Sequence, residues 1–117
     1  MNFLRQIFSS TSPEAMSAAK TKAQSIIDEN AVAVFSKSYC PYCKASKNLL
    51  DGLGAKYFLI ELDQVGDGNA IQDALFEING QRTVPNIYIG QKHIGGNSDL
   101  QAKKGELESL LKEVGAV

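Results

Sequence analysis

The spacing of apolar and polar positions changes in a regular order along the chain and predicts alternating strands and helices. Residues 31–35 are all apolar and Ser36 follows them, which is typical of a strand covered on both faces. Residues 57–62 are apolar except for Glu61, which predicts a second buried strand. Two shorter segments, residues 86–89 and 92–94, flank Gly90-Gln91, a pair suited to a hairpin turn. The predicted strands are therefore residues 31–36, 57–62, 86–89 and 92–94.

Four helical segments are predicted between and around these strands. The first begins at Ser12-Pro13-Glu14, where Ser caps the helix, Pro occupies its first position and an acid lies in its first turn. It runs to about Glu29, and Asn30 terminates it. The other predicted helices run from Cys40 to Gly52 or Gly54, over 70–78, and from 97 to about 114 with an interruption near Gly105.

The order of elements is α-β-α-β-α-β-β-α, which indicates an α/β fold. A βαβ unit followed by a hairpin predicts a mixed sheet with helices on both faces. A chain of 117 residues is typical of one domain, which we place at residues 13–117, after an N-terminal arm of residues 1–12.

Net charge, the length of the apolar runs and the number of cysteines limit the partners and the cellular location that we expect. The formal net charge is −1, so we expect neither a nucleic-acid nor a membrane partner. No apolar run approaches the ~20 residues that span a bilayer. Two cysteines in one short motif are too few for a secreted disulfide framework, so we expect a reducing compartment and a cytoplasmic location.

The arm leaves an alternative location open. It carries Arg5 and no acid, and its apolar residues have helix-like spacing: Phe3, Leu4, Ile7 and Phe8. Such a segment resembles a short presequence for a mitochondrion or another organelle. We favour the second interpretation, a loosely docked N-terminal arm.

The motif Cys40-Pro41-Tyr42-Cys43 holds both cysteines of the chain, where a strand ends and a helix begins. A C-x-x-C at this place is typical of a thioredoxin-like redox site. Free backbone N–H groups and the positive end of the helix dipole favour a thiolate at Cys40. Cys43 lies about one turn further on the same face, where it can resolve a mixed disulfide formed at Cys40.

Two other segments are candidates for the same site. Thr83-Val84-Pro85 precedes a strand; its proline is either an ordinary loop proline or a cis proline that presents the Val84 backbone to an extended ligand. Residues 95–99 (GGNSD) form either a plain hairpin exit or an N–H-lined pocket for a small carboxylate. We expect the lysines near the cysteines to be solvated: Lys37, Lys44 and Lys47.

Together these motifs resemble the dithiol glutaredoxins, in particular fungal and plant members. The resemblance rests on residues 37–43 (KSYCPYC), 79–85 (NGQRTVP) and 95–99, in this order and spacing, and it covers about residues 17–114. It implies a thioredoxin fold with a four-stranded mixed sheet. It also implies that glutathione is the co-substrate and that protein–glutathione mixed disulfides and protein disulfides are reduced.

The resemblance also implies roles for single residues. Cys40 is the nucleophile and Cys43 the resolving thiol. Lys37 and Gln72 contact the glycine carboxylate of glutathione, Val84 before a cis Pro85 pairs with its cysteinyl backbone, and Ser98 and Asp99 hold its γ-glutamyl end. The full set of expected glutathione contacts is Lys37, Tyr42, Gln72, Thr83, Val84, Pro85, Gly96, Ser98 and Asp99. We expect a monomer with no metal and no permanently bound cofactor.

Three alternatives remain at this point. A thioredoxin-type disulfide reductase is the nearest, but the chain has no tryptophan, and that family carries one at its active site. A glutathione-assisted iron–sulfur carrier is the second, although Pro41 and Cys43 resemble members that do not carry a cluster. A structural zinc site needs four ligands, and Cys40, Cys43 and His93 supply three.

Overall fold

The computed structural model describes residues 11–117, so the expectations for residues 1–10 of the arm lie outside the described part of the chain. The first described helix, α2, runs Pro13–Glu29 with Pro at its start and Asn30 at its end, as predicted. The Ser12 hydroxyl accepts a hydrogen bond from the Ala15 N–H at 3.2 Å. This cap satisfies one of the backbone donors that a helix start leaves free.

Four strands form one mixed sheet in the order β2-β1-β3-β4. Strand β1 pairs in parallel with β2 and antiparallel with β3, which in turn pairs antiparallel with β4. The strands are β1 Val32–Ser36, β2 Phe58–Glu61, β3 Asn86–Ile89 and β4 Lys92–Gly95. The predicted mixed sheet is confirmed, and the hairpin turn at Gly90-Gln91 has positive φ at both residues.

The strand predicted at residues 57–62 is present as β2, Phe58–Glu61, but the prediction that it is buried is wrong. Strand β2 lies at the edge of the sheet, and Phe58 and Leu59 are 40% and 39% exposed. Ile60 packs into the core. An edge strand pairs with a neighbour on one side only, so part of its surface stays open to solvent even where its residues are mostly apolar.

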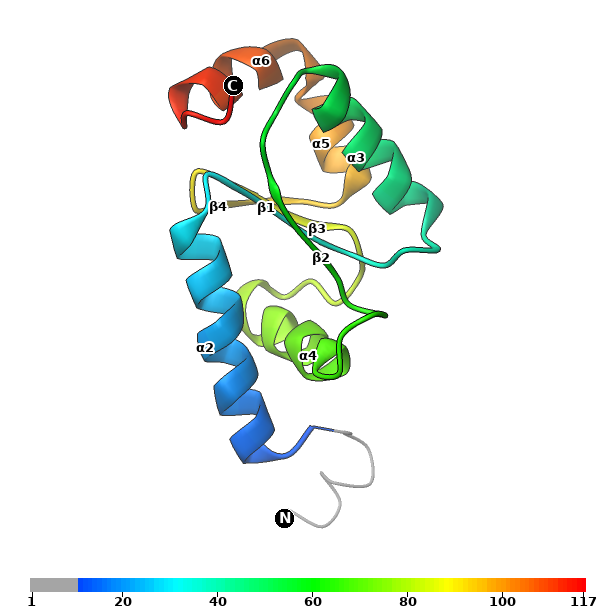
Figure 1. The fold of residues 1–117 in the computed structure, drawn as a ribbon, viewed down its shortest axis with the longest axis vertical. Helices are drawn as coiled ribbons and strands as arrows, with labels where there is room; N and C mark the ends of the chain where they lie inside the picture. Colours follow the sequence, from blue (N-terminus) through cyan, green and yellow to red (C-terminus); the bar gives the residue numbers. More distant parts are fainter. Residues whose placement is uncertain (1–10) are drawn as a thin grey trace.

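Helices cover both faces of the sheet, as predicted. Helices α2 and α4 lie on one face and α3, α5 and α6 on the other (Figure 1). Their bounds are α3 Pro41–Gly52, α4 Gly68–Asn79, α5 Asn97–Ala102 and α6 Lys104–Glu113, so the predicted interruption of the last helical region falls at Lys103. Between residues 11 and 117, no helix is both long and apolar enough to cross a membrane.

Strand β1 divides the core into two layers. Ala33 and Phe35 pack with α2 and α4, whereas Val32 and Val34 pack with the helices of the opposite face. This alternation follows from the two-residue period of a strand, which directs successive side chains to opposite faces. A central strand is buried on both faces, and this explains the run of apolar residues from Val32 to Phe35, which only Ser36 at the strand end departs from.

Gly68 brings the start of α4 against the end of β2. A Cβ atom at this position would lie 1.7 Å from the carbonyl oxygen of Leu62. No side chain fits at that separation, so the close approach of helix and strand depends on glycine.

Candidate active site

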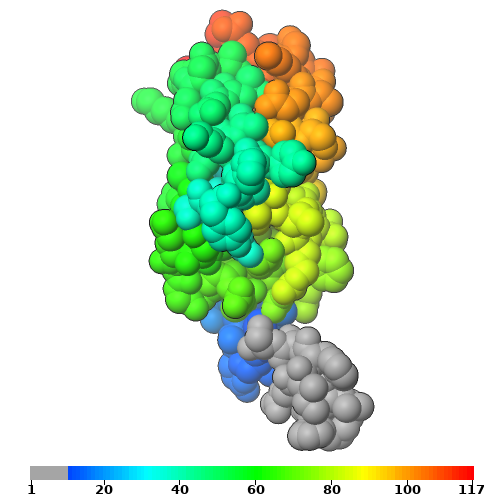
Figure 2. All heavy atoms as spheres, turned by 90° about the vertical axis from the view of Figure 1, so that its right-hand side faces the viewer, coloured from blue at the N-terminus to red at the C-terminus, as the bar shows by residue number. Residues whose placement is uncertain are grey.

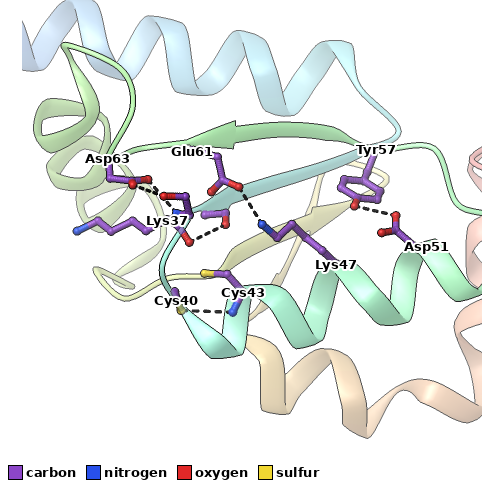
Figure 3. A network of polar contacts seen from close by, with 10 residues as sticks. Lys37, Cys40, Cys43, Lys47, Asp51, Tyr57, Glu61 and Asp63 are labelled. Carbon is purple, nitrogen blue, oxygen red and sulfur yellow. Dashed lines mark hydrogen bonds and ion pairs between the residues drawn. The ribbon is translucent and has the colours of Figure 1, made fainter.

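Cys40 lies at the N-cap of α3, in front of the first helical turn. Its sulfur accepts a hydrogen bond from the Cys43 N–H at 3.3 Å (Figure 3). Its carbonyl accepts one from the Lys44 N–H at 3.1 Å. Pro41 occupies the first helical position, where a missing N–H costs nothing. The sulfur therefore faces the positive end of the helix dipole, which stabilises negative charge.

Cys43 occupies a different environment, although both thiols are free. Cys43 is fully buried, whereas Cys40 is partly exposed. The pKa of Cys43 is raised to about 11, mainly by burial and next by its hydrogen bond with Cys40, against the lowering effect of its hydrogen bond with Ser36. Cys43 thus remains a protonated thiol at neutral pH while Cys40 meets solvent.

The loop before β3 lies across from the cysteines. The Val84–Pro85 peptide bond is cis, the second of the two interpretations of this proline. The carbonyl oxygen of Val84 lies 3.8 Å from the Cys40 sulfur and accepts its weak S–H hydrogen bond. The Val84 backbone is therefore adjacent to the nucleophile.

A groove of about 620 Å³ extends from this point. Figure 2 shows the face where the segments around α3, the loop before β3 and the start of α5 meet, although they are far apart in sequence. The groove is lined by Tyr42, Gln81, Thr83, Val84, Pro85, Gly96, Asn97, Ser98 and Asp99. Seven of the nine expected glutathione contacts line it together. Gln81 and Asn97 were not among those expected.

Asp99 is held at the α5 end of the groove. Its Oδ2 atom accepts a hydrogen bond from the Gly96 N–H at 2.9 Å. Gly95 has φ +120°, and a Cβ atom there would lie 2.3 Å from the same oxygen. The glycine pair therefore lets the chain turn closely around the carboxylate, which adds a negative charge to this end of the groove.

Lys37 and Gln72 do not line the groove. The Gln72 side chain donates to the carbonyl oxygen of Arg82 at 2.6 Å, so it contacts the loop from outside. Lys37 is partly buried near Asp63, whose pKa is lowered mainly by hydrogen bonds from the Ser38 hydroxyl and N–H, and to a smaller degree by the charge of Lys37. These two expected contacts lie around the groove rather than in its lining.

An ion pair joins the active-site helix α3 to strand β2. Lys47 Nζ is 2.8 Å from Glu61 Oε2, and their side chains are only 19% and 16% exposed (Figure 3). The expectation that Lys47 is solvated is therefore wrong. The reason is tertiary. Lys47 lies one turn after Cys43 on α3, and Glu61 pairs in register with Ser36 of β1, so the helix brings Lys47 to Glu61 and shields both side chains from solvent.

A second connection that the sequence analysis missed joins the arm to the loop before β3. The Thr11 hydroxyl donates to Asp73, which is almost fully buried on α4. Asp73 also forms an ion pair with Arg82, the residue before Thr83. Nothing in the local sequence pairs residues 62 positions apart, so no signal could have revealed this contact.

The histidine considered as a zinc ligand has another partner. His93 Nε2 lies 3.0 Å from Gln81 Oε1. Within residues 11–117, no three His, Cys, Asp or Glu side chains are grouped closely enough to hold a metal ion.

Comparisons with known proteins agree with this geometry. The family model described as Glutaredoxin matches residues 32–94, which span the cysteines, the loop before β3 and the hairpin. A glutaredoxin of Ricinus communis is 57% identical over 101 residues, covering 85% of this chain and 99% of its own length. Glutaredoxin-1 of Saccharomyces cerevisiae is 53% identical over 95 residues, covering 76% of this chain and 86% of its own.

A solved structure gives the same result in three dimensions. The complex of buckwheat glutaredoxin with glutathione has a TM-score of 0.88 and 50% sequence identity to this chain. The match covers 91% of this chain and 98% of the buckwheat protein. The four-stranded mixed sheet with helices on both faces is thus the thioredoxin fold of these proteins.

Proposed function

This chain belongs to the glutaredoxin family and is a glutathione-dependent thiol oxidoreductase, and we propose that its main reaction removes glutathione from glutathionylated proteins. The observation that carries this proposal is the position of Cys40, whose sulfur lies at a helix N-terminus and 3.8 Å from the Val84 carbonyl at the edge of the groove. The thioredoxin-type and iron–sulfur alternatives are not favoured by these relatives.

The proposed reaction has two exchange steps. The Cys40 thiolate attacks the glutathione sulfur of a protein–glutathione disulfide, a new S–S bond forms to Cys40, and the protein leaves as a thiolate that takes a proton from water. The thiolate of a second glutathione then attacks the glutathione sulfur bound to Cys40. Oxidised glutathione leaves, and Cys40 returns as a thiolate.

The groove supports one orientation of glutathione. We assign the Val84 backbone as the partner of the cysteinyl part, because it lies beside the Cys40 sulfur. The carboxylate of Asp99 at the far end has the charge that an ammonium group needs, so the γ-glutamyl end is placed there. The glycine carboxylate then extends toward Lys37 and Gln72, outside the groove lining. The buckwheat complex, whose partner is glutathione, supports a ligand in this groove.

We assign Cys43 to a second reaction, the reduction of disulfides between or within proteins. After Cys40 attacks such a disulfide, Cys43 attacks Cys40, and the Cys40–Cys43 disulfide forms as the second protein thiol leaves. The raised pKa of Cys43, about 11, keeps it protonated until that step. Glutathione then reduces the pair, so that electrons pass from glutathione to protein disulfides.

The proposed partners are glutathione and proteins that carry mixed or internal disulfides, and the proposed state is a monomer. We propose a cytoplasmic location, because the two cysteines form a redox motif rather than a secreted disulfide framework. An organellar location through residues 1–12 is the alternative, and ten of these residues lie outside the described part of the chain.

One coupled assay tests the proposal. Turnover of a glutathionylated protein is followed with glutathione, glutathione reductase and NADPH, and in parallel with thioredoxin reductase and NADPH. We expect turnover in the first system, retained in Cys43→Ser and lost in Cys40→Ser, because glutathione itself resolves the intermediate. A folded Cys43→Ser protein that is inactive with glutathione would instead support a thioredoxin-type reaction.

A further inference from the structure

The loop that carries Val84 is tied back to the protein by one side chain. The amide nitrogen of Gln81 donates to two carbonyl oxygens, that of Thr83 at 3.0 Å and that of Pro85 at 2.9 Å. These carbonyls flank Val84 on each side. The carbonyl of Val84 itself faces the Cys40 sulfur instead.

The same side chain is held in orientation by His93. Because both hydrogens of the Gln81 amide point to carbonyls, its Oε1 atom must accept, and it lies 3.0 Å from His93 Nε2. The donor must therefore be an Nε2–H group. The imidazole ring packs against Tyr88 with the ring centres 5.2 Å apart, which limits its rotation.

The backbone of Gln81 is fixed as well. Its N–H donates to Asn79 Oδ1 at 2.7 Å, and its carbonyl accepts from Asn86 Nδ2 at 3.2 Å. Every polar group of Gln81 thus has a partner among residues 79–93. Because all of its polar groups are hydrogen-bonded within the protein, the Gln81 side chain is held in one orientation, unlike a surface amide that bonds to water.

We propose that Gln81, oriented by His93, is a positioning residue of the glutathione reaction: it holds the carbonyls of Thr83 and Pro85 and thereby keeps the Val84 backbone aligned with Cys40 and the groove. This inference rests on the proposed use of the groove by glutathione. Gln81 acts through the loop and is not a catalytic residue. A loop that is held before binding pays less ordering entropy when the ligand docks.

The chemical consequence is a separation of binding from chemistry. Neither Gln81 nor His93 contacts a reacting sulfur, so their loss leaves the nucleophile and the helix N-terminus unchanged. Without these hydrogen bonds, the loop of residues 81–85 is less well held and binds the glutathione part of the substrate more weakly. The apparent KM for a glutathionylated substrate therefore rises, while kcat changes little.

The first experiment compares Gln81→Met with Gln81→Glu in the full chain. Methionine keeps the length without hydrogen bonds, and glutamate turns oxygen atoms toward both carbonyls. We expect the apparent KM to rise roughly fivefold to tenfold for Gln81→Met, the worth of one or two hydrogen bonds, and more for Gln81→Glu. Gln24→Met is the control, because Gln24 bonds only within α2, to Asp28. An unchanged KM in folded Gln81→Met would overturn the proposal.

The second experiment tests the part played by His93. His93→Gln keeps a side-chain N–H donor and should retain most of the wild-type KM, whereas His93→Leu should reproduce the defect of Gln81→Met. Equal KM values for the two His93 variants would contradict the proposed orientation of Gln81 by a donor.

A spectroscopic measurement does not depend on activity at all. Partial desolvation lowers the pKa of His93, against the opposing effect of Asp99. The imidazole ring is therefore uncharged at pH 7 and above. Nitrogen-15 NMR should then show the Nε2–H tautomer in the wild type and a mixture of tautomers in Gln81→Met. An Nδ1–H tautomer in the wild type would refute the arrangement. Failure of the wild-type protein to turn over glutathione would refute the proposed function and leave this result standing.

Discussion

Removal of Cys40 leaves a single thiol, and the structure predicts how poorly that thiol reacts. In Cys40→Ser the remaining sulfur, that of Cys43, is fully buried behind the helix N-terminus. The attacking species in disulfide exchange is the thiolate, so the rate depends on the ionised fraction and on access to it. Both are unfavourable at Cys43.

The size of the effect follows from the pKa of about 11 for Cys43. At pH 7 this value corresponds to a thiolate fraction of ~10⁻⁴, against ~3% for a free thiol, a difference of ~300-fold. The substitution also removes the hydrogen bond and charge of Cys40, which contribute to the raised pKa. Burial is the largest cause and stays, so the pKa of Cys43 should remain above that of a free thiol.

The assay is the rate of alkylation by iodoacetamide as a function of pH, for Cys40→Ser and Cys43→Ser side by side. We expect the Cys43 thiol to react ever faster up to at least pH 10, with a rate at pH 7 at least ~30-fold below that of a free thiol. Both variants alkylated in denaturant serve as the control for intrinsic reactivity. Rapid alkylation of folded Cys40→Ser at pH 7 would refute the reasoning, because it would mean that Cys43 is ionised or accessible.

Two further predictions concern the edge of the groove and the fold. Lys37→Glu should raise the apparent KM for glutathione several-fold through repulsion of its glycine carboxylate, with stability changed by less than ~1 kcal/mol. Lys104 is exposed at the start of α6, so Lys104→Glu makes the same charge change as a control, and equal kinetics in both variants would remove Lys37 from the site. Gly68→Ala should lower the free energy of unfolding in urea by ~3 kcal/mol or more, because the new Cβ meets the Leu62 carbonyl at 1.7 Å. Gly66→Ala has open space and should change it by less than ~0.5 kcal/mol, so similar losses in both would contradict the packing argument.

The sequence by itself determined the order of elements and the place of the redox motif. Helix starts and stops are local, so Ser12 and Pro13 marked the start of α2 and Asn30 its end. The apolar run from Val32 to Phe35 indicated a central strand, because a strand covered on both faces buries successive side chains on each of them. The C-x-x-C between strand and helix placed Cys40 at an N-cap for the same local reason.

Some features were within reach of the sequence but needed the structure to decide between alternatives. Pro85 was compatible with a cis or a trans bond, and the cis form is the one observed. Residues 57–62 are mostly apolar, as a buried strand would be, yet they form an edge strand. Their place at the edge depends on which strands pair, and the sequence of one strand does not determine its partners.

Only the tertiary structure decided the contacts between segments far apart in the chain. Lys47 became a partly buried partner of Glu61 because the fold brings α3 to β2, and Thr11 reached Asp73 because α2 lies against α4. Gln81 acquired its role because the hairpin returns His93 to within 3.0 Å of its amide oxygen. Each of these side chains is an ordinary polar residue in its local sequence, and its partner is chosen by packing, which no short pattern encodes.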